Sequence, residues 1–533
     1  MLERLTSSAA VAAARQQIAA LFNQHAEWFC TTSNGGTAGR GETYALRRDE
    51  MHISVAQERL VLSCWTEKGS RSWRVLSWEW NGQALLLQAS RRMGAELPLI
   101  ELVPRASATA VAATIRAARQ VRCDRLAQLA CVTAPRMQHV LGQSACATAP
   151  LETRIERAAL SPGTRLGQPG RYARVLLRRK QMRIAVTGPV VASGPGSVDA
   201  FLSSALLWHK RTADRLKPPY IAELWLIVSS ELVKSLLYRV ALLREGLRNM
   251  IRVFLVDDDL VKLTEAECLE RHDLWKKKVV RFPPVPLAIT SPQTAAIIAV
   301  APEAIDVVHS RHGETLRYFG LPFARVRSLL GSERVWFGLD AARRRLLDDS
   351  TRREWENLLH DLRAYRSASA ADRHHAFYRS AAEAWLESLL RRDITQLDPG
   401  LIIAPLHAQF RTAHGGKLGI RPVDLLALRQ DGRLVVIELK VSEDREHVLQ
   451  GADYWRRVEA HRRRGHIARA KLFGDLKISD ESPLVYLVAP TLRVHPSFQT
   501  LARCISGDIE IYRFDINEDW RSGVRVMRRL RVN

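Results

Sequence analysis

The chain has 533 residues, of which 47% are hydrophobic and 26% are charged. This length exceeds what one hydrophobic core supports, so we expect about three or four domains of ordinary globular composition. No apolar run is long enough to span a membrane, and the seven cysteines are scattered without a C-x-x-C pair. The composition therefore argues against a membrane partner, a disulfide framework and a zinc knuckle, and it favours a reducing, cytoplasmic setting.

The formal net charge is +24, and arginine is far more frequent than lysine. A surface this basic favours an anionic partner, with nucleic acid as the first candidate. A generally arginine-rich composition without a specific partner is the alternative, and charge alone leaves both open.

We expect residues 1–150 to form a mixed α/β domain of unknown role. A helix opens this segment, strand-like runs follow, and the helical stretch ATAVAATIRAARQVRCDRLAQLA closes it. Trp73, Trp78 and Trp80 alternate with other residues within strand-like sequence. Aromatic residues in such positions can stack on bases, but they more often fill a core, and we predict a core role here.

A second α/β domain is expected over residues 151–265. YARVLLRR and MRIAVTGPVV are predicted to be paired strands, followed by a helix with Ser197 as its N-cap and by two further buried strands. Residues 266–370 contain a basic connector with prolines, short strands and one helix, so we expect a small strand-and-helix region there.

Residues 371–533 are predicted to form a C-terminal domain. The predicted order is a helix, three strands, a long basic helix and a buried strand, which is α-β-β-β-α-β, followed by an α-β extension. The fold class expected for the whole chain is therefore α/β, arranged as an α+β multidomain protein.

Two carboxylates and a lysine stand near the ends of two neighbouring predicted strands. Asp424 begins VDLLALR, whereas Glu438 and Lys440 end RLVVIELKV and project from one face of that strand. Cutting a phosphodiester requires a divalent metal, and Mg²⁺ prefers oxygen ligands from one or two carboxylates. A nearby lysine can orient the attacking water or offset developing charge. We therefore predict a Mg²⁺ or Mn²⁺ site made by Asp424, Glu438 and the Leu439 carbonyl, beside Lys440.

The register of this hairpin decides whether the groups meet. A two-residue turn at Asp431-Gly432 would place Asp424 opposite Leu439, on the wrong side of the sheet. A three-residue loop that ends at a left-handed Gly432 would instead place Asp424 opposite Glu438. The chemistry requires the second register, and Gly432 permits it.

Solvated charges on an edge strand are the structural alternative to a site. The apolar run before Glu438 and the later strand LVYLVAP predict instead a sheet that is buried on both faces. Buried carboxylates and a buried ammonium are costly unless they are used or paired, which favours the site.

These motifs resemble the PD-(D/E)XK nuclease superfamily. Asp424, the E-L-K triplet at 438–440 and the series Gln450-x-x-x-Tyr454 are similar to the branch of RecB-type, lambda-exonuclease-type and NucS-type nucleases. The resemblance covers roughly residues 377–515, and the literal PD pair is absent because a valine stands between Pro422 and Asp424. It implies a restriction-endonuclease-like αβββαβ core for residues 371–533.

Carried over by position, the resemblance implies Asp424 and Glu438 as metal ligands and Lys440 as the catalytic lysine. It places Gln450 and Tyr454 on a helix that lines the cleft. Many members add a glutamate from the first helix, and Glu383 and Glu387 share one helix face, with Glu383 favoured. Several arginines follow on the long basic helix and can contact phosphates or form a solvated face: Arg456, Arg457, Arg462, Arg463 and Arg464.

The middle domain repeats the pattern of the C-terminal one. RIAVTGPVVAS at 183–193 aligns with RLVVIELKVS at 433–442, which places Gly188 at the position of Glu438 and Val190 at that of Lys440. One hypothesis is a degenerate nuclease-like domain that has lost its metal site and serves in DNA binding, dimerisation or scaffolding. An unrelated α/β domain with a similar order of elements is the alternative.

The expected function is metal-dependent hydrolysis of phosphodiester bonds by the C-terminal domain. DNA is favoured over RNA because the resembled families act mostly on DNA, and a role in DNA repair or defence follows from the resemblance alone. An idle nucleic-acid-binding or scaffold protein that retains a nuclease fold is the rival hypothesis. A nucleotide-sensing middle domain is compatible with either. The choice between endonuclease and exonuclease and the formation of a homodimer stay open.

Overall fold

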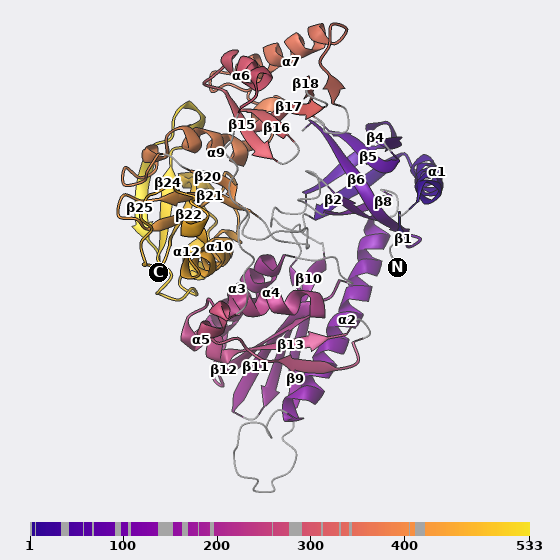
Figure 1. Ribbon diagram of the computed structural model, residues 1–533. Coiled ribbons are helices and arrows are strands. Elements are labelled where there is room, and N and C mark those ends of the chain that lie inside the picture. Colours follow the sequence, from indigo (N-terminus) through magenta and orange to yellow (C-terminus); the bar gives the residue numbers. More distant parts are fainter. Residues whose placement is uncertain are drawn as a thin grey trace.

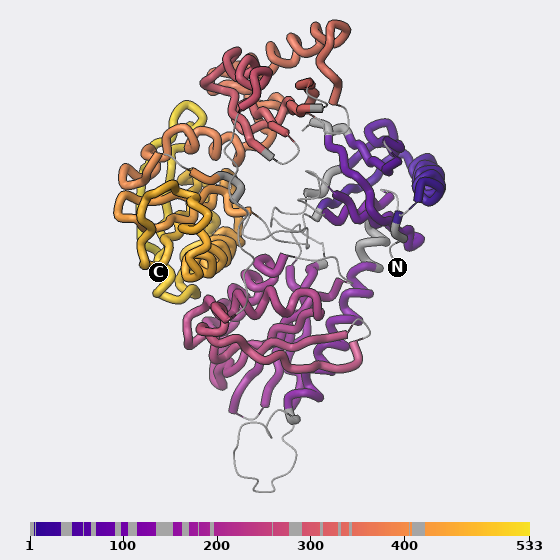
Figure 2. Tube along the Cα trace, viewed as in Figure 1, coloured from indigo at the N-terminus to yellow at the C-terminus, as the bar shows by residue number. Residues whose placement is uncertain are grey.

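Four β-sheets form four lobes of the molecule (Figure 1), which confirms the expected multidomain mixture of helices and strands. The two chain termini lie in different lobes (Figure 2). The computed structural model describes residues 3–5, 7–33, 42–56, 58–66, 69–90, 98–104, 108–136, 153–162, 169–179, 181–191, 197–257, 260–276, 290–310, 313–329, 332–339, 344–403, 406–410 and 422–533.

The first lobe is an antiparallel sheet of order β3-β2-β8-β7-β6-β5-β4, with β1 paired to β6 and one helix packed against it. Trp73 and Trp78 are buried in its core and Trp80 packs against that core, so the predicted core role is confirmed. The elements are β1 (Glu3–Arg4), α1 (Ser8–Gln24), β2 (Glu27–Ser33), β3 (Glu42–Arg47), β4 (Met51–Ala56), β5 (Arg59–Thr66), β6 (Gly69–Trp80), β7 (Leu85–Ser90) and β8 (Leu99–Pro104).

Helix α2 (Ala108–Arg136) corrects the predicted domain boundary at residue 150. The sequence suggested that this helix closes the first domain. Its buried face, which includes Cys123, Leu126 and Ala130, packs instead on Val175 and Leu177 of the second sheet. An amphipathic pattern predicts that a helix covers some apolar surface but not which sheet provides it. The boundary therefore lies between β8 and α2.

The middle lobe is a sheet of order β14-β13-β12-β11-β10-β9, in which β11, β12 and β13 run parallel and the other pairs are antiparallel. The predicted pairing of YARVLLRR with MRIAVTGPVV and the predicted cap at Ser197 are both confirmed. The elements are β9 (Thr153–Pro162), β10 (Pro169–Arg179), β11 (Met182–Pro189), α3 (Val198–Arg215), β12 (Ile221–Val228), α4 (Ser230–Val240), α5 (Glu245–Met250), β13 (Ile251–Val256) and β14 (Leu263–Ala266).

The third lobe is an antiparallel meander, β15 to β19, with helices α6 and α7. Arg317 of this lobe forms ion pairs with Asp306 (2.7 Å) and with Glu387 of the C-terminal lobe (3.1 Å). The elements are α6 (Pro292–Ala299), β15 (Ile305–Ser310), β16 (Gly313–Tyr318), β17 (Leu321–Leu329), β18 (Ser332–Phe337), β19 (Arg345–Leu346) and α7 (Arg352–Tyr365).

The C-terminal lobe is a sheet of order β20-β21-β22-β23-β24-β25, with β22, β23 and β24 parallel. Every residue of β22 and β23 is buried, because α9 covers one face of the sheet and α10 the other, as predicted. The elements are α8 (Ala376–Arg379), α9 (Ala382–Arg392), β20 (His407–Phe410), β21 (Val423–Leu428), β22 (Leu434–Leu439), α10 (His447–Arg463), α11 (His466–Arg469), β23 (Leu484–Pro490), α12 (Phe498–Ala502), β24 (Ile511–Ile516) and β25 (Val526–Arg531).

The hairpin between β21 and β22 has the register that the chemistry requires. Arg429 faces Arg433 across the loop, with a hydrogen bond of 2.9 Å from the Arg429 amide to the Arg433 carbonyl, and Gly432 has a φ of +81°. Leu425 faces Ile437, so the next pair along the strands is Asp424 with Glu438. The predicted three-residue loop with a left-handed Gly432 is confirmed.

Gly432→Ala is expected to destabilise the protein more than Gly474→Ala does. Both glycines have positive φ, but a Cβ at Gly432 would lie 2.7 Å from the Lys477 carbonyl oxygen, whereas a Cβ at Gly474 meets nothing within 4 Å. The left-handed conformation alone costs about 1 kcal/mol for a non-glycine residue, and the close contact adds to it at Gly432. Chemical denaturation measures both variants, and equal losses of unfolding free energy would contradict the role of the contact.

Candidate active site

Asp424 and Glu438 form a carboxyl pair at the ends of two paired strands. Their side chains are in hydrogen-bond contact, and Asp424 Oδ2 also accepts the Leu439 N–H at 2.9 Å. Glu438 is buried with 2% of its surface exposed, whereas Asp424 is half-buried. Two carboxyl groups this close oppose each other's ionisation, which favours a proton on one of them.

Lys440 lies against this pair from the same strand. Its Nζ donates to Glu438 Oε1 at 2.5 Å and to the Leu439 carbonyl at 3.3 Å, and it lies 4.0 Å from Asp444 Oδ2. Burial alone would lower the pKa of Lys440, but the surrounding carboxylates, Glu438 foremost, raise this pKa well above its usual value. Lys440 is therefore a buried ammonium that stays charged.

The carboxyl pair has perturbed acidity. Burial and the neighbouring Glu438 raise the pKa of Asp424 to about 7. Burial also raises the pKa of Glu438, with Lys440 acting in the opposite direction. Acid groups whose pKa is raised by burial beside a fixed cation are typical of functional sites, although structural ion-pair networks shift pKa values as well.

The structure separates the two candidate glutamates of α9. Glu383, in the first turn, interacts electrostatically with both Glu438 and Lys440. Glu387, one turn further along, is buried and forms the ion pair with Arg317. Glu383 is thus the α9 glutamate that lies near the carboxyl pair, as the sequence favoured.

Gln450 and Tyr454 are both buried on α10. Gln450 is buried on α10, and its amide donates to Glu446 Oε2 at 3.3 Å. Tyr454 packs in the core between α10 and the sheet, among residues such as Val423 and Val436. Tyr454 is therefore part of the core, and the cleft-lining role that the resemblance implies for both residues stays a prediction.

Sequence reasoning missed three polar residues that lie between Lys440 and the first turn of α10, namely Asp444, Glu446 and His447. The carboxylate of Asp444 accepts a hydrogen bond from the Glu446 backbone amide at 2.7 Å. The Glu446 carboxylate accepts hydrogen bonds from the Gln450 side chain and from the Ser197 hydroxyl of the middle lobe. His447 Nε2 lies 3.2 Å from the Glu438 carbonyl oxygen, and burial together with Lys440 lowers the pKa of His447 to about 4, so this imidazole is neutral. The acidic and histidine residues crowded at 444–447 were the available signal.

Four arginines of α10 form ion pairs with carboxylates of the same helix, but each carboxylate serves two of them, so the helix keeps a positive charge and phosphate contact stays a prediction. Arg456 and Arg457 pair with Asp453, and Arg462 and Arg463 pair with Glu459. Arg464 donates to backbone carbonyls of Ala460 and Trp275. The carboxylates lie three and four residues before their arginines on the same helix, and they offset only part of the charge.

The donor set at the carboxyl pair fits a hard divalent cation. Within the described ranges, no group of three or more His, Cys, Asp or Glu side chains is arranged to hold a metal ion. Mg²⁺, however, is commonly held by one or two carboxylates with waters completing its octahedron. Asp424 and Glu438, with the Leu439 carbonyl beside them, supply oxygens of this kind at positions close enough to share a proton.

Comparison of the chain with family models, with curated proteins and with solved structures found no match. Among the described residues, none of the helices combines the length and apolar character needed to cross a membrane.

Proposed function

We propose that the chain is a metal-dependent nuclease that hydrolyses phosphodiester bonds, with DNA as the favoured substrate and Mg²⁺ or Mn²⁺ as the cofactor. The observation that carries this proposal is the convergence of Asp424, Glu438 and Lys440 on one face of a buried hairpin, with Glu383 nearby. The resemblance to PD-(D/E)XK nucleases and the net charge of +24 support it.

Each group has a role that follows from its placement. Asp424 and Glu438 are the residues that would hold the cation, which when bound supplies Lewis acidity and lowers the pKa of a coordinated water. Lys440 stays protonated next to them and offsets the negative charge that develops on the phosphate. Asp424 keeps partial contact with solvent, which gives a substrate phosphate a route of approach.

An idle nucleic-acid-binding or scaffold protein is the rival. Two acids and an ammonium buried together are expensive to keep, and replacing such groups with apolar residues is often neutral or stabilising. A protein with no use for the site has no physical reason to retain them, which favours an active nuclease.

Cleavage assays on closed plasmid, linear duplex, single-stranded DNA and RNA test the proposal. We expect cutting with Mg²⁺ or Mn²⁺ and none with EDTA. Cutting of closed circles would identify an endonuclease, and degradation from ends alone an exonuclease. DNA binding without cutting under any metal would favour the idle scaffold.

Cation binding is expected to weaken as the pH falls below about 7. The raised pKa of Asp424 means that the metal-free pair holds a proton near neutrality, and the cation has to displace it. One displaced proton weakens the apparent affinity about tenfold for each pH unit below 7, and the affinity levels off above it. Calorimetric titration of Mn²⁺ in buffers of different ionisation enthalpy measures both the affinity and the released proton. Affinity independent of pH between about 5.5 and 8 would contradict the shared proton.

A further inference from the structure

The middle and C-terminal lobes have the same architecture. Strands β9 to β14 repeat β20 to β25 in neighbour order and in the direction of every pairing. Helix α3 follows the third strand of one sheet as α10 follows that of the other, and α4 with α5 stands where α12 does. This match supports the middle lobe as a copy of the C-terminal one.

In the middle lobe, the three positions equivalent to the candidate site carry no acidic or basic side chain. Ala173 faces Gly188 across the β10–β11 hairpin, as Asp424 faces Glu438 in the other lobe. Val190 is at the position of Lys440 and is buried. A Cβ added at Gly188 would lie 3.1 Å from the Cβ of Ile227, so even a small side chain is tight there.

The two lobes contact each other through equivalent elements. Helix α10 contacts α4, α12 contacts α3, and α3 contacts α10. The segments that follow α4 and α12 form an antiparallel bridge between Leu243 and Ile505. Two reciprocal hydrogen bonds flank this bridge, from the Arg244 amide to the Cys504 carbonyl at 2.9 Å and from the Ser506 amide to the Leu242 carbonyl at 3.0 Å. Contacts of this reciprocal kind are the mark of a two-fold interface.

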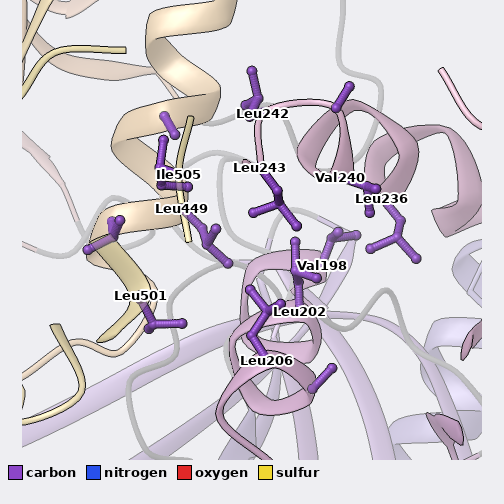
Figure 3. Close-up of a cluster of buried hydrophobic side chains, with 14 of the residues drawn as sticks. Val198, Leu202, Leu206, Leu236, Val240, Leu242, Leu243, Leu449, Leu501 and Ile505 are labelled. Atoms are coloured by element: carbon purple, nitrogen blue, oxygen red, sulfur yellow. The ribbon is translucent and has the colours of Figure 1, made fainter. Parts of the chain in front are cut away.

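The N-caps of the two equivalent helices also meet. Ser197, at the start of α3, donates its hydroxyl to Glu446 Oε2 at 2.6 Å, and Glu446 stands at the start of α10. Figure 3 shows one apolar core that joins both lobes, with Val198, Leu202, Leu206, Leu236 and Val240 from the middle lobe against Leu449, Leu501 and Ile505. The lobes therefore pack against each other about a local two-fold axis.

Three arginines crowd together at the seam between these lobes. Arg174 follows Ala173 on β10, and its guanidinium lies 3.5 Å from Ser204 Oγ and 5.9 Å from the ring centre of Trp208, both on α3. Arg211 is almost one turn beyond Trp208 on that helix. Arg445 belongs to the C-terminal lobe, and its backbone carbonyl accepts the Ser203 hydroxyl at 3.4 Å.

This cluster concentrates positive charge at the contact between the two lobes. Burial and the proximity of Arg211 and Arg445 lower the pKa of Arg174 to about 10. Arg211 and Arg445 are exposed, and none of the three forms an ion pair with a carboxylate in the described part of the chain. Arg445 is five residues beyond Lys440 in the chain. It directly follows Asp444, whose carboxylate lies 4.0 Å from the Lys440 ammonium. Like charges held together at a surface favour an anionic ligand, and guanidinium groups suit phosphate.

We propose that the middle lobe is a catalytically silent internal partner of the C-terminal lobe, and that Arg174, Arg211 and Arg445 bind the phosphate backbone of the nucleic acid across the seam. The inference rests on the proposed function and extends it, because it names where the strand is held beside the site.

Binding of a labelled DNA duplex in EDTA, measured at several salt concentrations, tests this inference without any cleavage. The double variant Arg174→Gln/Arg211→Gln is expected to bind at least about tenfold more weakly and to lose about two units of the log–log salt slope, one for each lost phosphate contact. Lys210→Gln is the matched control, because this exposed lysine neighbours Arg211 but pairs with Asp214. It is expected to retain almost all the affinity.

Equal affinity and slope in wild type and the double variant would overturn the inference. If Arg174→Gln prevents folding, the single variant Arg211→Gln tests the inference, because Arg211 is exposed. It is expected to reduce the log–log salt slope by about one unit. Cleavage of the same duplex with Mg²⁺ separates the two proposals. If the wild type cuts the duplex and the arginine variant binds it equally well, phosphate binding by the arginines is refuted and the nuclease proposal stands. If binding depends on the arginines but the duplex is not cut, the nuclease proposal is refuted and the binding site stands. A protein that neither binds nor cuts the duplex refutes both proposals.

Discussion

Glu438→Gln is expected to abolish cleavage while leaving the protein as stable as the wild type to within about 1 kcal/mol. Loss of one electrostatic contributor in an active site costs about 10²- to 10³-fold in rate, and loss of a metal ligand costs no less. Stability is retained because glutamine keeps the shape of the side chain and removes a buried acid whose ionisation burial already opposes. Lys440 keeps Asp424, Asp444 and Glu383 as compensating charges.

Lys440→Met is the informative contrast. Both variants are expected to lose activity, but the methionine leaves Glu438 and Asp424 buried without their ammonium, at a cost of about 3–5 kcal/mol. Cleavage rates and urea denaturation measure the two properties separately. Glu443→Gln is the control, since that acid is exposed and close in the chain. A Glu438→Gln variant that still cuts, or that unfolds while Glu443→Gln does not, would show that the pair is a structural salt bridge.

Asp453→Asn is expected to destabilise the protein by about 3–5 kcal/mol at neutral pH. Asp453 is fully buried on α10, where it pairs with Arg456 at 2.7 Å, with Arg457, and with Arg239 of the middle lobe at 3.3 Å. Arg239 is also bound to Asp199 at 2.7 Å, so the acid holds together a charge cluster between the two lobes. Its loss leaves buried guanidinium groups short of a counter-charge.

The same variant has a defined pH dependence. Burial alone would raise the pKa of Asp453, but Arg239, Arg456 and Arg457 hold this pKa far below its usual range. A depressed folded-state pKa contributes stability that is complete above the unfolded value of about 4 and is lost progressively below it. The gap between wild type and Asp453→Asn is therefore expected to be constant from about pH 6 to 8 and to shrink below about pH 4. Denaturation at pH 7 and pH 3.5 measures it, with the exposed Asp480→Asn as control. A gap that widens in acid would contradict the assignment.

The hairpin register could be predicted from sequence because one local rule and one chemical demand agreed. Side chains alternate along a strand, and Gly432 at the third loop position permits the bulge that places Asp424 opposite Glu438. The salt bridges within α10 were also readable in principle, since Asp453 and Glu459 precede their arginines by three and four residues.

Other features depend on parts of the chain that a local pattern does not connect. Glu383 and Glu387 share a helix face. They differ because Glu387 pairs with Arg317, which lies about 70 residues earlier in the chain. The sequence likewise does not predict which sheet α2 covers, because the small apolar face of this helix could pack on more than one sheet. The seam arginines come from three separate segments, and no spacing in the sequence brings Arg174 and Arg445 together.

The reciprocal contacts between the middle and C-terminal lobes lie within one polypeptide. In a pair of identical chains every substitution appears twice, so neither half can lose a carboxylate without the other losing it too. Covalent linkage removes this constraint, and Ala173 and Gly188 can change while Asp424 and Glu438 persist. It also makes the pairing intramolecular, so that its occupancy does not depend on dilution or on how much of the protein a cell makes.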